Sequence, residues 1–475
     1  FGIKPFYYIH EGDRFYFGST LSAISCIQGF RKAVSSDATS AYFLQGYVPS
    51  PLSMYENIHK LLPGHCLEFN LESFEYFIKP YWKITDYLDS RSISFEDAVE
   101  KMERLIEDSI RLRMRSDVPL GAFLSGGVDS SLVVSILAKL CPNKVKTFSI
   151  GFIEKEFNEA PVAKKISQHL GTEHNELILS SNDVKDIVPQ FPKYHDEPFA
   201  DSSGLPTYLL SKFAKEQVTV AMSGDGGDEV ALGAYNQYLR AGLWGKLEQI
   251  PRPLRRFLGY ITKPVALGKI DSLSYSLLAN DLIEYTYFLK RVYDYRIHPG
   301  LLSTNDTYYD LSQRLLKRIG HSNYADIGWT KSVSTLDFFN LLPDDFLTKV
   351  DRASMANSLE VRVPLLDYRI VEFSRSIPEN ILLEKGYKSL LRAILEKYVP
   401  KTIWDLPKSG FAVPLKHWFR DELYEYSKEV ILDKSVSGYN IDVAAKIIEQ
   451  HKLGSRDNSR LIWALLSFAL WTKKS

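Results

Sequence analysis

The stretch that decides the fold is Ser125-Gly126-Gly127-Val128-Asp129-Ser130-Ser131. The apolar run at 118–124 before it is typical of a buried strand, and the apolar run at 132–140 after it is typical of a helix. Glycines between a strand and a helix let backbone N–H groups close around an anion at the helix N-terminus. These seven residues therefore predict a turn that binds pyrophosphate.

The same turn carries side chains suited to that ligand. Serine hydroxyls add hydrogen-bond donors, and Asp129 supplies a carboxylate that can hold Mg²⁺ against the anion. The turn lacks the lysine of a GxxxxGK[ST] loop, so it is less suited to gripping the terminal phosphates of a nucleotide. The form S-G-G-x-D-S resembles the loop of ATP pyrophosphatases, enzymes that cut ATP between its α- and β-phosphates to adenylate a substrate. An ordinary glycine-rich turn is the alternative interpretation.

The composition is that of a globular protein of two or three domains. The chain has 475 residues, of which 45% are apolar and 24% charged. Lys+Arg and Asp+Glu both number 58, so the chain has no net charge that would attract a polyanion. No nucleic-acid partner is therefore expected. No apolar run approaches a membrane span and no signal peptide is visible. We therefore expect a cytoplasmic enzyme with small-molecule substrates and no membrane partner.

Three cysteines, Cys26, Cys66 and Cys141, lie far apart with no CxxC pair. This spacing argues against a disulfide framework, a zinc ribbon and paired-cysteine sulfur transfer. We expect three reduced cysteines in apolar surroundings, with Cys26 in the core.

The first 75 residues are rich in short strands. Strands are predicted at 6–10, 14–18 and 66–69, with a hairpin turn at Gly12-Asp13 and a helix at 37–44. The opening residues are typical of a chain that enters a domain midway. We therefore predict that residues 1–75 are the end of a longer domain, that 76–94 form a linker, and that a second domain covers 95–475.

From residue 95 the pattern changes to helices that alternate with strands. The predicted strands are 146–152, 176–179 and 218–222, and the predicted helices are 95–112, 159–170 and a segment from Asp183 onward. This alternation implies an α/β fold with a doubly wound parallel sheet, whose ligands lie at the carboxyl ends of the strands. Residues from about 235 to 475 are predicted to be mainly helical.

A second cluster, Ser223-Gly224-Asp225-Gly226-Gly227-Asp228-Glu229, follows the predicted strand at 218–222. A solvated Asp/Gly turn is the alternative interpretation. The sheet, however, places this turn beside the first loop and brings Asp228 near Asp129, so that the two carboxylates and a pyrophosphate can share one Mg²⁺. Asp225 then remains available to accept a proton or to orient a nucleophile.

Five motifs in order resemble the glutamine-dependent asparagine synthetases, over nearly the whole chain. They are LSGGVDSS at 124–131 with SGDGGDE at 223–229, LPDDFLTKVDRASMA at 342–356, EVRVPLLD at 360–367 and PKSGF at 407–411. The opening FGIKPFYY resembles the late part of that family's N-terminal glutaminase domain. The resemblance implies an adenine nucleotide alpha hydrolase-like (ATP-pyrophosphatase) domain, a large helical C-terminal part, and before both the β-rich end of an Ntn-type, class II glutamine amidotransferase domain.

The resemblance also implies residue roles. Asp129 and Asp228 match the family's Mg²⁺ ligands, and Asp225 stands where the family has an acidic residue needed for the adenylate chemistry. Lys408 matches a lysine that steadies the developing charge on the phosphates. The residues expected to bind ATP or pyrophosphate are Leu124, Ser125, Gly126, Gly127, Asp129, Ser130, Ile150, Ser223 and Gly224.

The implied reaction is an ATP-dependent amidation. A substrate carboxylate attacks the α-phosphorus of ATP to give an acyl-adenylate and pyrophosphate, and Mg²⁺, the loop amides and Lys408 stabilise the charge that develops. Ammonia then attacks the activated carbonyl and AMP leaves. Asp225 is suited to take the proton that ammonia loses, in a site kept dry because the intermediate hydrolyses in water. The expected conversion is L-aspartate to L-asparagine.

Two departures from the family bear on this expectation. The family's glutaminase nucleophile is an N-terminal cysteine, and no residue here matches it. We therefore expect that this chain as written uses free ammonia, and that in the native protein a preceding segment supplies ammonia from glutamine. The motifs also leave the acceptor pocket open. Residues 195–203 are expected to line it, and a sugar uronic acid of a polysaccharide stays as the alternative acceptor.

Two further classes of protein fit less well. A tRNA-modifying enzyme with the same loop would have a basic face and often paired cysteines. A silent regulatory subunit would have lost Asp129, Asp225 or Asp228, and all three are present. The oligomeric state is not given by the sequence, and a homodimer stays open.

Overall fold

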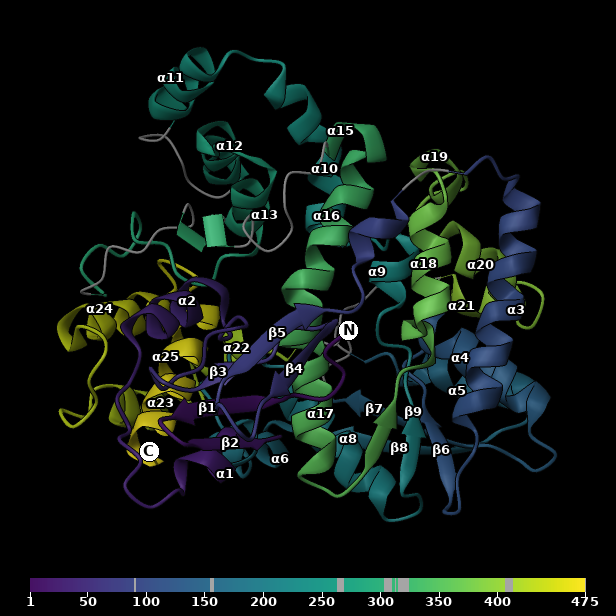
Figure 1. Ribbon diagram of the computed structural model, residues 1–475, viewed down its shortest axis with the longest axis horizontal. Helices are drawn as coiled ribbons and strands as arrows, with labels where there is room; N and C mark the ends of the chain where they lie inside the picture. The colour runs from purple at the N-terminus through teal and green to yellow at the C-terminus, as the bar shows by residue number, and fades with distance from the viewer. Residues whose placement is uncertain are drawn as a thin grey trace.

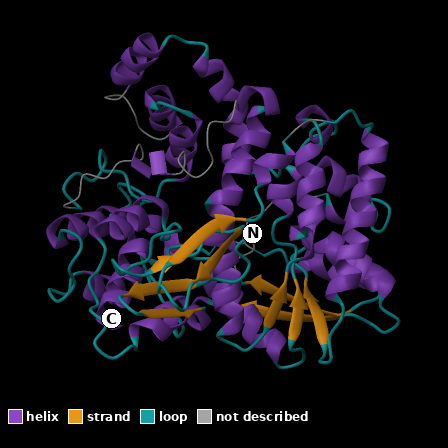
Figure 2. Ribbon diagram, viewed as in Figure 1, coloured by secondary structure: helices purple, strands orange, loops and turns teal. Residues whose placement is uncertain are grey.

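The computed structural model describes residues 1–88, 91–153, 158–262, 269–302, 310–311, 313–314, 324–405 and 413–474. Two groups of strands are visible, one at the N-terminal end of the chain and one in the following part (Figure 2). Helices surround both groups, and the yellow C-terminal helices lie against the purple N-terminal segment (Figure 1).

A five-stranded parallel sheet forms the centre of the second group. Its strands, in the spatial order β10-β9-β6-β7-β8, are β10 (Glu360–Arg362), β9 (Val220–Met222), β6 (Leu120–Phe123), β7 (Lys146–Phe152) and β8 (Glu173–Leu179). Every neighbouring pair is parallel. Helices α4 (Val128–Leu140) and α5 (Ala160–Leu170) lie on one side of the sheet, and α8 (Gly204–Lys215) with α17 (Thr348–Met355) lies on the other (Figure 1). The predicted doubly wound parallel sheet is confirmed.

The strand predictions differ from the structure mainly at the strand ends. The strand 146–152 is found with the predicted bounds, whereas β8 begins three residues earlier than predicted and β9 two residues later. Strand β10 was not predicted, because its three residues lie in a mainly helical region and become a strand only by pairing with β9.

The first group of strands is antiparallel. A three-stranded sheet, β2-β1-β3, and the hairpin β4-β5 make up this part. Their bounds, with the two helices between them, are β1 (Tyr7–Glu11), β2 (Arg14–Gly18), α1 (Leu21–Ser25), α2 (Ser36–Gln45), β3 (His59–Lys60), β4 (His65–Phe69) and β5 (Tyr76–Pro80). Helix α2 begins after Ser35, whose hydroxyl accepts a hydrogen bond from the N–H of Ala38, and it ends at Gly46 in the left-handed conformation. The expected β-rich N-terminal part is confirmed.

The remaining regular elements of the described chain are helices, and residues after about 235 are mainly helical, as predicted. The segment from Asp183 onward forms several short helices rather than one. The remaining elements are η1 (Ile84–Tyr87), α3 (Phe95–Arg113), α6 (Ser181–Lys185), η3 (Val188–Gln190), α7 (Phe191–His195), α9 (Gly227–Ala231), α10 (Asn236–Glu248), α11 (Arg252–Thr262), α12 (Lys269–Leu278), α13 (Leu282–Lys290), α15 (Tyr324–Ile327), α16 (Trp329–Phe339), η5 (Leu342–Leu347), η6 (Pro364–Leu366), α18 (Tyr368–Ser376), α19 (Glu379–Leu382), α20 (Ser389–Leu395), α21 (Lys401–Trp404), α22 (Leu415–Trp418), α23 (Tyr424–Ile431), α24 (Ile441–Lys452) and α25 (Ser459–Lys474).

The N-terminal part shares a core with the C-terminal helices. Tyr42 of α2 is buried, its ring stacks on Phe468 of α25, and its hydroxyl donates to the carbonyl of Ala464 at 2.8 Å. The buried carboxylate of Glu197, in the connection between α7 and α8, also binds the N-terminal part through hydrogen bonds. The oxygens of Glu197 accept from the Tyr7 hydroxyl at 3.1 Å and from the N–H of Met54 at 2.8 Å.

Two of the sequence expectations concern cysteines and membranes. Cys26, Cys66 and Cys141 are all free, but Cys26 is exposed at the C-cap of α1, so the prediction that it lies in the core is wrong. Among the helices of the described residues, none combines the length and the apolar character that crossing a membrane requires.

We expect Glu197→Ala to destabilise the fold by about 3–5 kcal/mol, because it removes one partner of a buried ion pair. Lys60 Nζ lies 2.7 Å from Glu197 Oε2, and the two side chains are only 12% and 8% exposed. Urea unfolding followed by circular dichroism measures the loss. The matched control is Glu68→Ala, which breaks the exposed pair with Lys79 and should cost about 0–1 kcal/mol. Equal losses in the two variants would contradict the interpretation.

Candidate functional site

The predicted phosphate loop lies between β6 and α4. Leu124 is buried and its N–H donates to the carbonyl of Phe148 at 2.9 Å, so the loop leaves the sheet in register with β7. Gly126 has φ +85°, which a residue with a Cβ rarely adopts. Helix α4 begins after Gly127, which has no side chain to cap the first helical N–H groups. These groups are therefore directed at the loop, as an anion site requires.

Hydrogen bonds within the loop set the positions of its two serine hydroxyls. Ser130 Oγ lies 3.0 Å from Ser125 Oγ and accepts from the N–H of Ser125 at 3.2 Å. The N–H of Gly127 donates to Ser125 Oγ at 3.3 Å. Both hydroxyls are thereby held at the N-terminus of α4, beside the N–H groups that would meet an anion.

The acidic turn follows β9. The N–H of Ser223 donates to the carbonyl of Arg362 in β10 at 2.9 Å, which extends the sheet by one bond into the turn. The Ser223 hydroxyl donates to Asp225 Oδ2 at 2.6 Å and orients that carboxylate. Gly226, with φ +87°, turns the chain into the short helix α9, which carries Asp228 on its first turn.

The two loops touch at two glycines of the acidic turn, Gly224 against the backbone of the phosphate loop and Gly227 against the Asp129 side chain. A Cβ added to Gly224 would lie 2.5 Å from the nitrogen of Ser130, and one added to Gly227 would lie 2.4 Å from Cγ of Asp129. Both distances are far too short for a real side chain. The two glycines are therefore needed for the close approach that brings Asp129 beside the acidic turn.

Lys388 lies between the two carboxylates that the sequence assigned to Mg²⁺. Its Nζ is 2.5 Å from Asp129 Oδ2 and 2.8 Å from Asp228 Oδ1. Burial disfavours the charged ammonium, but the two carboxylates more than offset it and raise the pKa of Lys388 above its ordinary value. Sequence reasoning missed this residue; its backbone is left-handed, with φ 56°, just before α20, and nothing local marks it.

This geometry fits a divalent cation. Asp129 and Asp228 come from different loops and are close enough to share one positive group. Among the described residues there is no cluster of three or more His, Cys, Asp or Glu side chains that could hold a metal by themselves. Mg²⁺ commonly binds through one or two carboxylates together with substrate phosphates and waters. Asp129 and Asp228 can therefore hold it jointly with a bound pyrophosphate group.

Of the two remaining predicted residues, the structure describes Ile150 but not Lys408. Ile150 is buried in β7, two positions beyond Phe148, which is paired with Phe123 at the end of β6. It thus lies at the same edge of the sheet as the phosphate loop. Lys408 lies outside the described residues.

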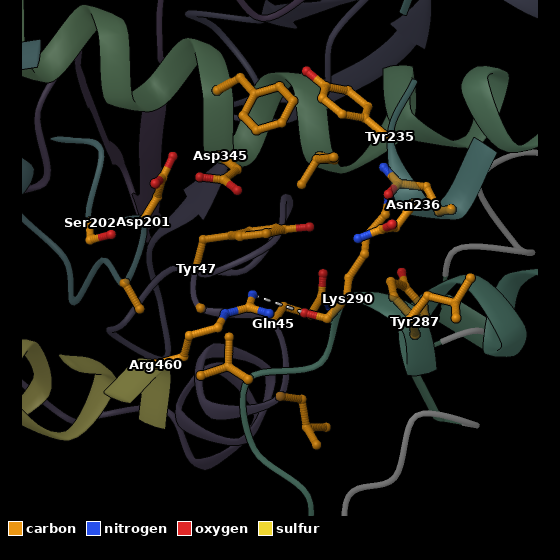
Figure 3. Close-up of a pocket in the computed structure, with 18 of the residues that line it drawn as sticks. Gln45, Tyr47, Asp201, Ser202, Tyr235, Asn236, Tyr287, Lys290, Asp345 and Arg460 are labelled. Atoms are coloured by element: carbon orange, nitrogen blue, oxygen red, sulfur yellow. Dashed lines mark hydrogen bonds between the residues drawn. The ribbon is translucent and has the colours of Figure 1, made fainter. Parts of the chain in front are cut away.

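The structure also contains a cavity of about 360 Å³ (Figure 3). From the predicted acceptor segment, Ala200, Asp201 and Ser202 line it. The other walls come from the end of α2, the start of α10, α13, η5, α22 and α25; among them are Gln45, Tyr47, Tyr235, Asn236, Tyr287, Lys290, Asp345, Phe346 and Arg460.

Two residues connect the cavity to the acidic turn. The ring of Tyr235 packs against Phe346 with centroids 5.9 Å apart, and burial together with the charges of Glu229 and Asp228 raises its pKa well above the ordinary value. Lys349 binds Asp201 at 3.0 Å, and Asp225 is among the carboxylates that keep its pKa raised although burial opposes the charge. The cavity and the acidic turn are therefore neighbours.

The first residues of the predicted acceptor segment, from His195 to Glu197, do not line the cavity. His195 is buried between the rings of Phe191 and Phe199, each 4.4 Å away, and burial lowers its pKa to about 3. It is therefore a neutral core residue. Asp196 forms an ion pair with Arg352 at 3.4 Å. Glu197 accepts a hydrogen bond from the N–H of Met54 in the N-terminal part.

Comparisons with known proteins agree with this architecture. Residues 101–473 match the family model described as asparagine synthase, and residues 1–82 match the model described as glutamine amidotransferase domain. Asparagine synthetase [glutamine-hydrolyzing] 1 of Bacillus subtilis is 31% identical over 478 residues, which cover 99% of this chain and 74% of that protein. Putative asparagine synthetase [glutamine-hydrolyzing] 2 of Methanocaldococcus jannaschii is 33% identical over 371 residues, covering 76% and 69%.

A more distant relative has a different name. Amidase chyE of Penicillium rubens is 24% identical over 448 residues, which cover 81% of this chain and 62% of that protein. Similarity to this sequence therefore extends beyond proteins named for asparagine synthesis. The family itself is settled by the match over residues 101–473 and by the relatives at 30% identity and above: the chain belongs to the asparagine synthase family.

Proposed function

We propose that this protein is an ATP-dependent amide ligase that converts L-aspartate to L-asparagine, releasing AMP and pyrophosphate. The observation that carries the proposal is the convergence of Asp129 and Asp228 on one cation position, at the N-terminus of α4 and next to a cavity. We further propose that residues 1–75 are the end of a glutaminase domain that supplies ammonia, a division supported by the match of residues 1–82.

The first step is adenylation. The carboxylate of the acceptor attacks the α-phosphorus of ATP, and the bond to the β-phosphate oxygen breaks to release pyrophosphate. The N–H groups at the start of α4 and the hydroxyls of Ser125 and Ser130 bind the phosphate oxygens. Asp129 and Asp228 would hold Mg²⁺, which would supply positive charge to neutralise the departing pyrophosphate.

Lys388 would compete with a metal ion for the position between Asp129 and Asp228. If the metal ion took that position, the Lys388 ammonium would be available to pair with phosphate oxygens. In this proposal Lys388 keeps the two carboxylates from repelling each other before the nucleotide arrives. Lys408, proposed from the resemblance alone, would add a second cation at the phosphates.

The second step is aminolysis of the adenylate. Ammonia attacks the carbonyl carbon, the C–N bond forms, and the C–O bond to the phosphate breaks to release AMP. The nitrogen must lose a proton as it adds. In this proposal Asp225, whose carboxylate accepts a hydrogen bond from the Ser223 hydroxyl at 2.6 Å, takes this proton. The cavity beside the turn would hold the acceptor.

The direct test is pyrophosphate release from ATP-Mg²⁺ and ammonium, with and without L-aspartate. We expect release that depends on aspartate, with one asparagine formed per pyrophosphate. Asp225→Asn should slow asparagine formation by about 100-fold, since general-base catalysis contributes about 10²–10⁴, while ATP still binds by calorimetry. Normal yield from that variant would exclude Asp225 as the base, and release without aspartate dependence would reject the acceptor.

A second prediction concerns the cation position. Asp129→Asn should largely abolish pyrophosphate release, because half of the carboxylate pair loses its charge. Lys388→Met should instead let Mn²⁺, measured by electron paramagnetic resonance without ATP, bind the protein about tenfold more tightly, since a competing charge pair worth about 1–2 kcal/mol is removed. Lys385→Met, three residues away and exposed, is the matched control and should change neither quantity. Unchanged Mn²⁺ affinity in Lys388→Met would contradict the competition.

A further inference from the structure

We propose that helix α11 lies on a membrane surface that carries anionic phospholipids, with its outward apolar face among the lipid chains and its arginines at the headgroups. The inference does not depend on the proposed function, because no residue of α11 lines the cavity or belongs to the two loops of the candidate site. It differs from the expectation drawn from the net charge, since that value averages over the whole chain and does not report a local cluster of charge.

Helix α11 presents several large apolar side chains to solvent. Those that are between 39% and 60% exposed are Leu254, Phe257, Leu258, Tyr260 and Ile261. They all fall within the eight residues 254–261. A single exposed apolar residue is ordinary on a protein surface, whereas a continuous exposed apolar patch indicates a site that meets a partner or a membrane.

The helix is oriented in the opposite way from a helix that packs on a protein core. Leu254, Phe257 and Ile261 are spaced by three and four residues, so they lie on one face. The buried residues of α11 are Arg255 and Gly259, which lie on the opposite face. A helix on a core buries its apolar stripe and exposes its polar face. In α11 an arginine faces the protein and the apolar stripe faces outward.

Contacts on the buried face fix this orientation. Arg255 donates to the carbonyl of Ala279 at 2.7 Å, and its guanidinium lies 4.8 Å from the centre of the Trp244 ring. Gly259 allows α12 to approach closely, because a Cβ added there would lie 2.8 Å from Cγ of Leu278. Since these contacts hold α11 by its polar face, its apolar face stays outward.

The charge of this segment favours an anionic surface. Residues 249–270 contain five basic residues and no acidic one, and three of the five are arginines of α11. Arg256 is exposed and lies one turn before Tyr260, at the edge of the apolar face, and Arg252 lies one turn before Arg256. Basic residues beside an apolar face with aromatic side chains are typical of helices that lie in the membrane interface. Guanidinium groups also bind phosphate through paired hydrogen bonds.

A second copy of this chain is a poorer match for the same face. Pairing of α11 with itself would bring the arginines of both copies together, with no carboxylate on either helix to neutralise them. Phospholipids supply negative charge at the headgroups and an apolar phase beneath them. Figure 1 shows α11 at the upper edge of the molecule, with α12 between it and α13, so an extended surface can reach the helix.

The experiment is co-sedimentation of the protein with vesicles of phosphatidylglycerol and phosphatidylcholine in equal amounts, compared with vesicles of phosphatidylcholine alone. We expect binding to the anionic vesicles that weakens as salt is added, because salt screens the attraction between arginine and phosphate. Phe257→Ser should weaken this binding about tenfold, because it withdraws a large apolar side chain from the lipid. Arg256→Gln should weaken it about fivefold, which is the usual contribution of one basic residue at an anionic surface.

The matched control is Phe77→Ser in β5, because Phe77 is 62% exposed and Phe257 is 60% exposed. This control should bind the anionic vesicles as wild type does. Arg256→Lys should bind more tightly than Arg256→Gln, since it keeps the charge. Circular dichroism checks that each variant is folded. If Phe77→Ser weakens binding as much as Phe257→Ser does, the effect is not specific to α11 and the inference fails.

Two other results would overturn the inference. Equal binding to the neutral and the anionic vesicles would remove the role of the arginines. Absence of vesicle binding would exclude the membrane, and a dimer in analytical ultracentrifugation that Phe257→Ser dissociates would then assign the face to a second copy. Neither result depends on pyrophosphate release, so this inference and the proposed function stand or fall separately.

Discussion

The close contact between the two loops, at Gly224 and Gly227, is the constraint on which the candidate site depends. Only glycine lets the acidic turn come within 2.4–2.5 Å, measured from a hypothetical Cβ, of Asp129 and Ser130. This contact places carboxylates from two loops around one position, which Lys388 occupies. Without it, the phosphate loop would be a helix N-terminus with one acidic residue, and the acidic turn would be an ordinary surface turn.

The same contact decides where an acceptor can lie. The acidic turn is held against the phosphate loop, and its carboxylates also act on the pKa values of Tyr235 and Lys349. Tyr235 lines the cavity. A nucleotide held by the phosphate loop and a carboxylate held in the cavity would meet at the turn that carries Asp225, which is the order of groups that an adenylation followed by aminolysis needs.

The parallel sheet and the antiparallel N-terminal strands were predictable from the sequence, because alternating apolar runs and glycine turns report local structure directly. The meeting of Asp129 and Asp228 was also predictable, since carboxyl ends of neighbouring parallel strands share one edge. Lys388, β10 and Asp345 were not. Each depends on residues far away in the chain: Lys388 on two loops more than 150 residues before it, β10 on pairing with β9, and Asp345 on a cavity whose walls come from six separate elements. The roles assigned to the site residues and the division of the chain at 75 and 94 remain predictions.

The walls of the cavity have one more consequence. Gln45 and Tyr47, at the end of α2, belong to the N-terminal part, whereas the opposite walls belong to the part that carries the phosphate loop. The segment 196–202 joins the two, since Glu197 holds Tyr7 and Met54 while Asp201 lines the cavity. The pocket is thus composite, and neither part contains it alone. A substitution at Gln45 or Tyr47 therefore changes the same cavity as a substitution in the part that carries the phosphate loop, so the two parts cannot vary independently at these walls.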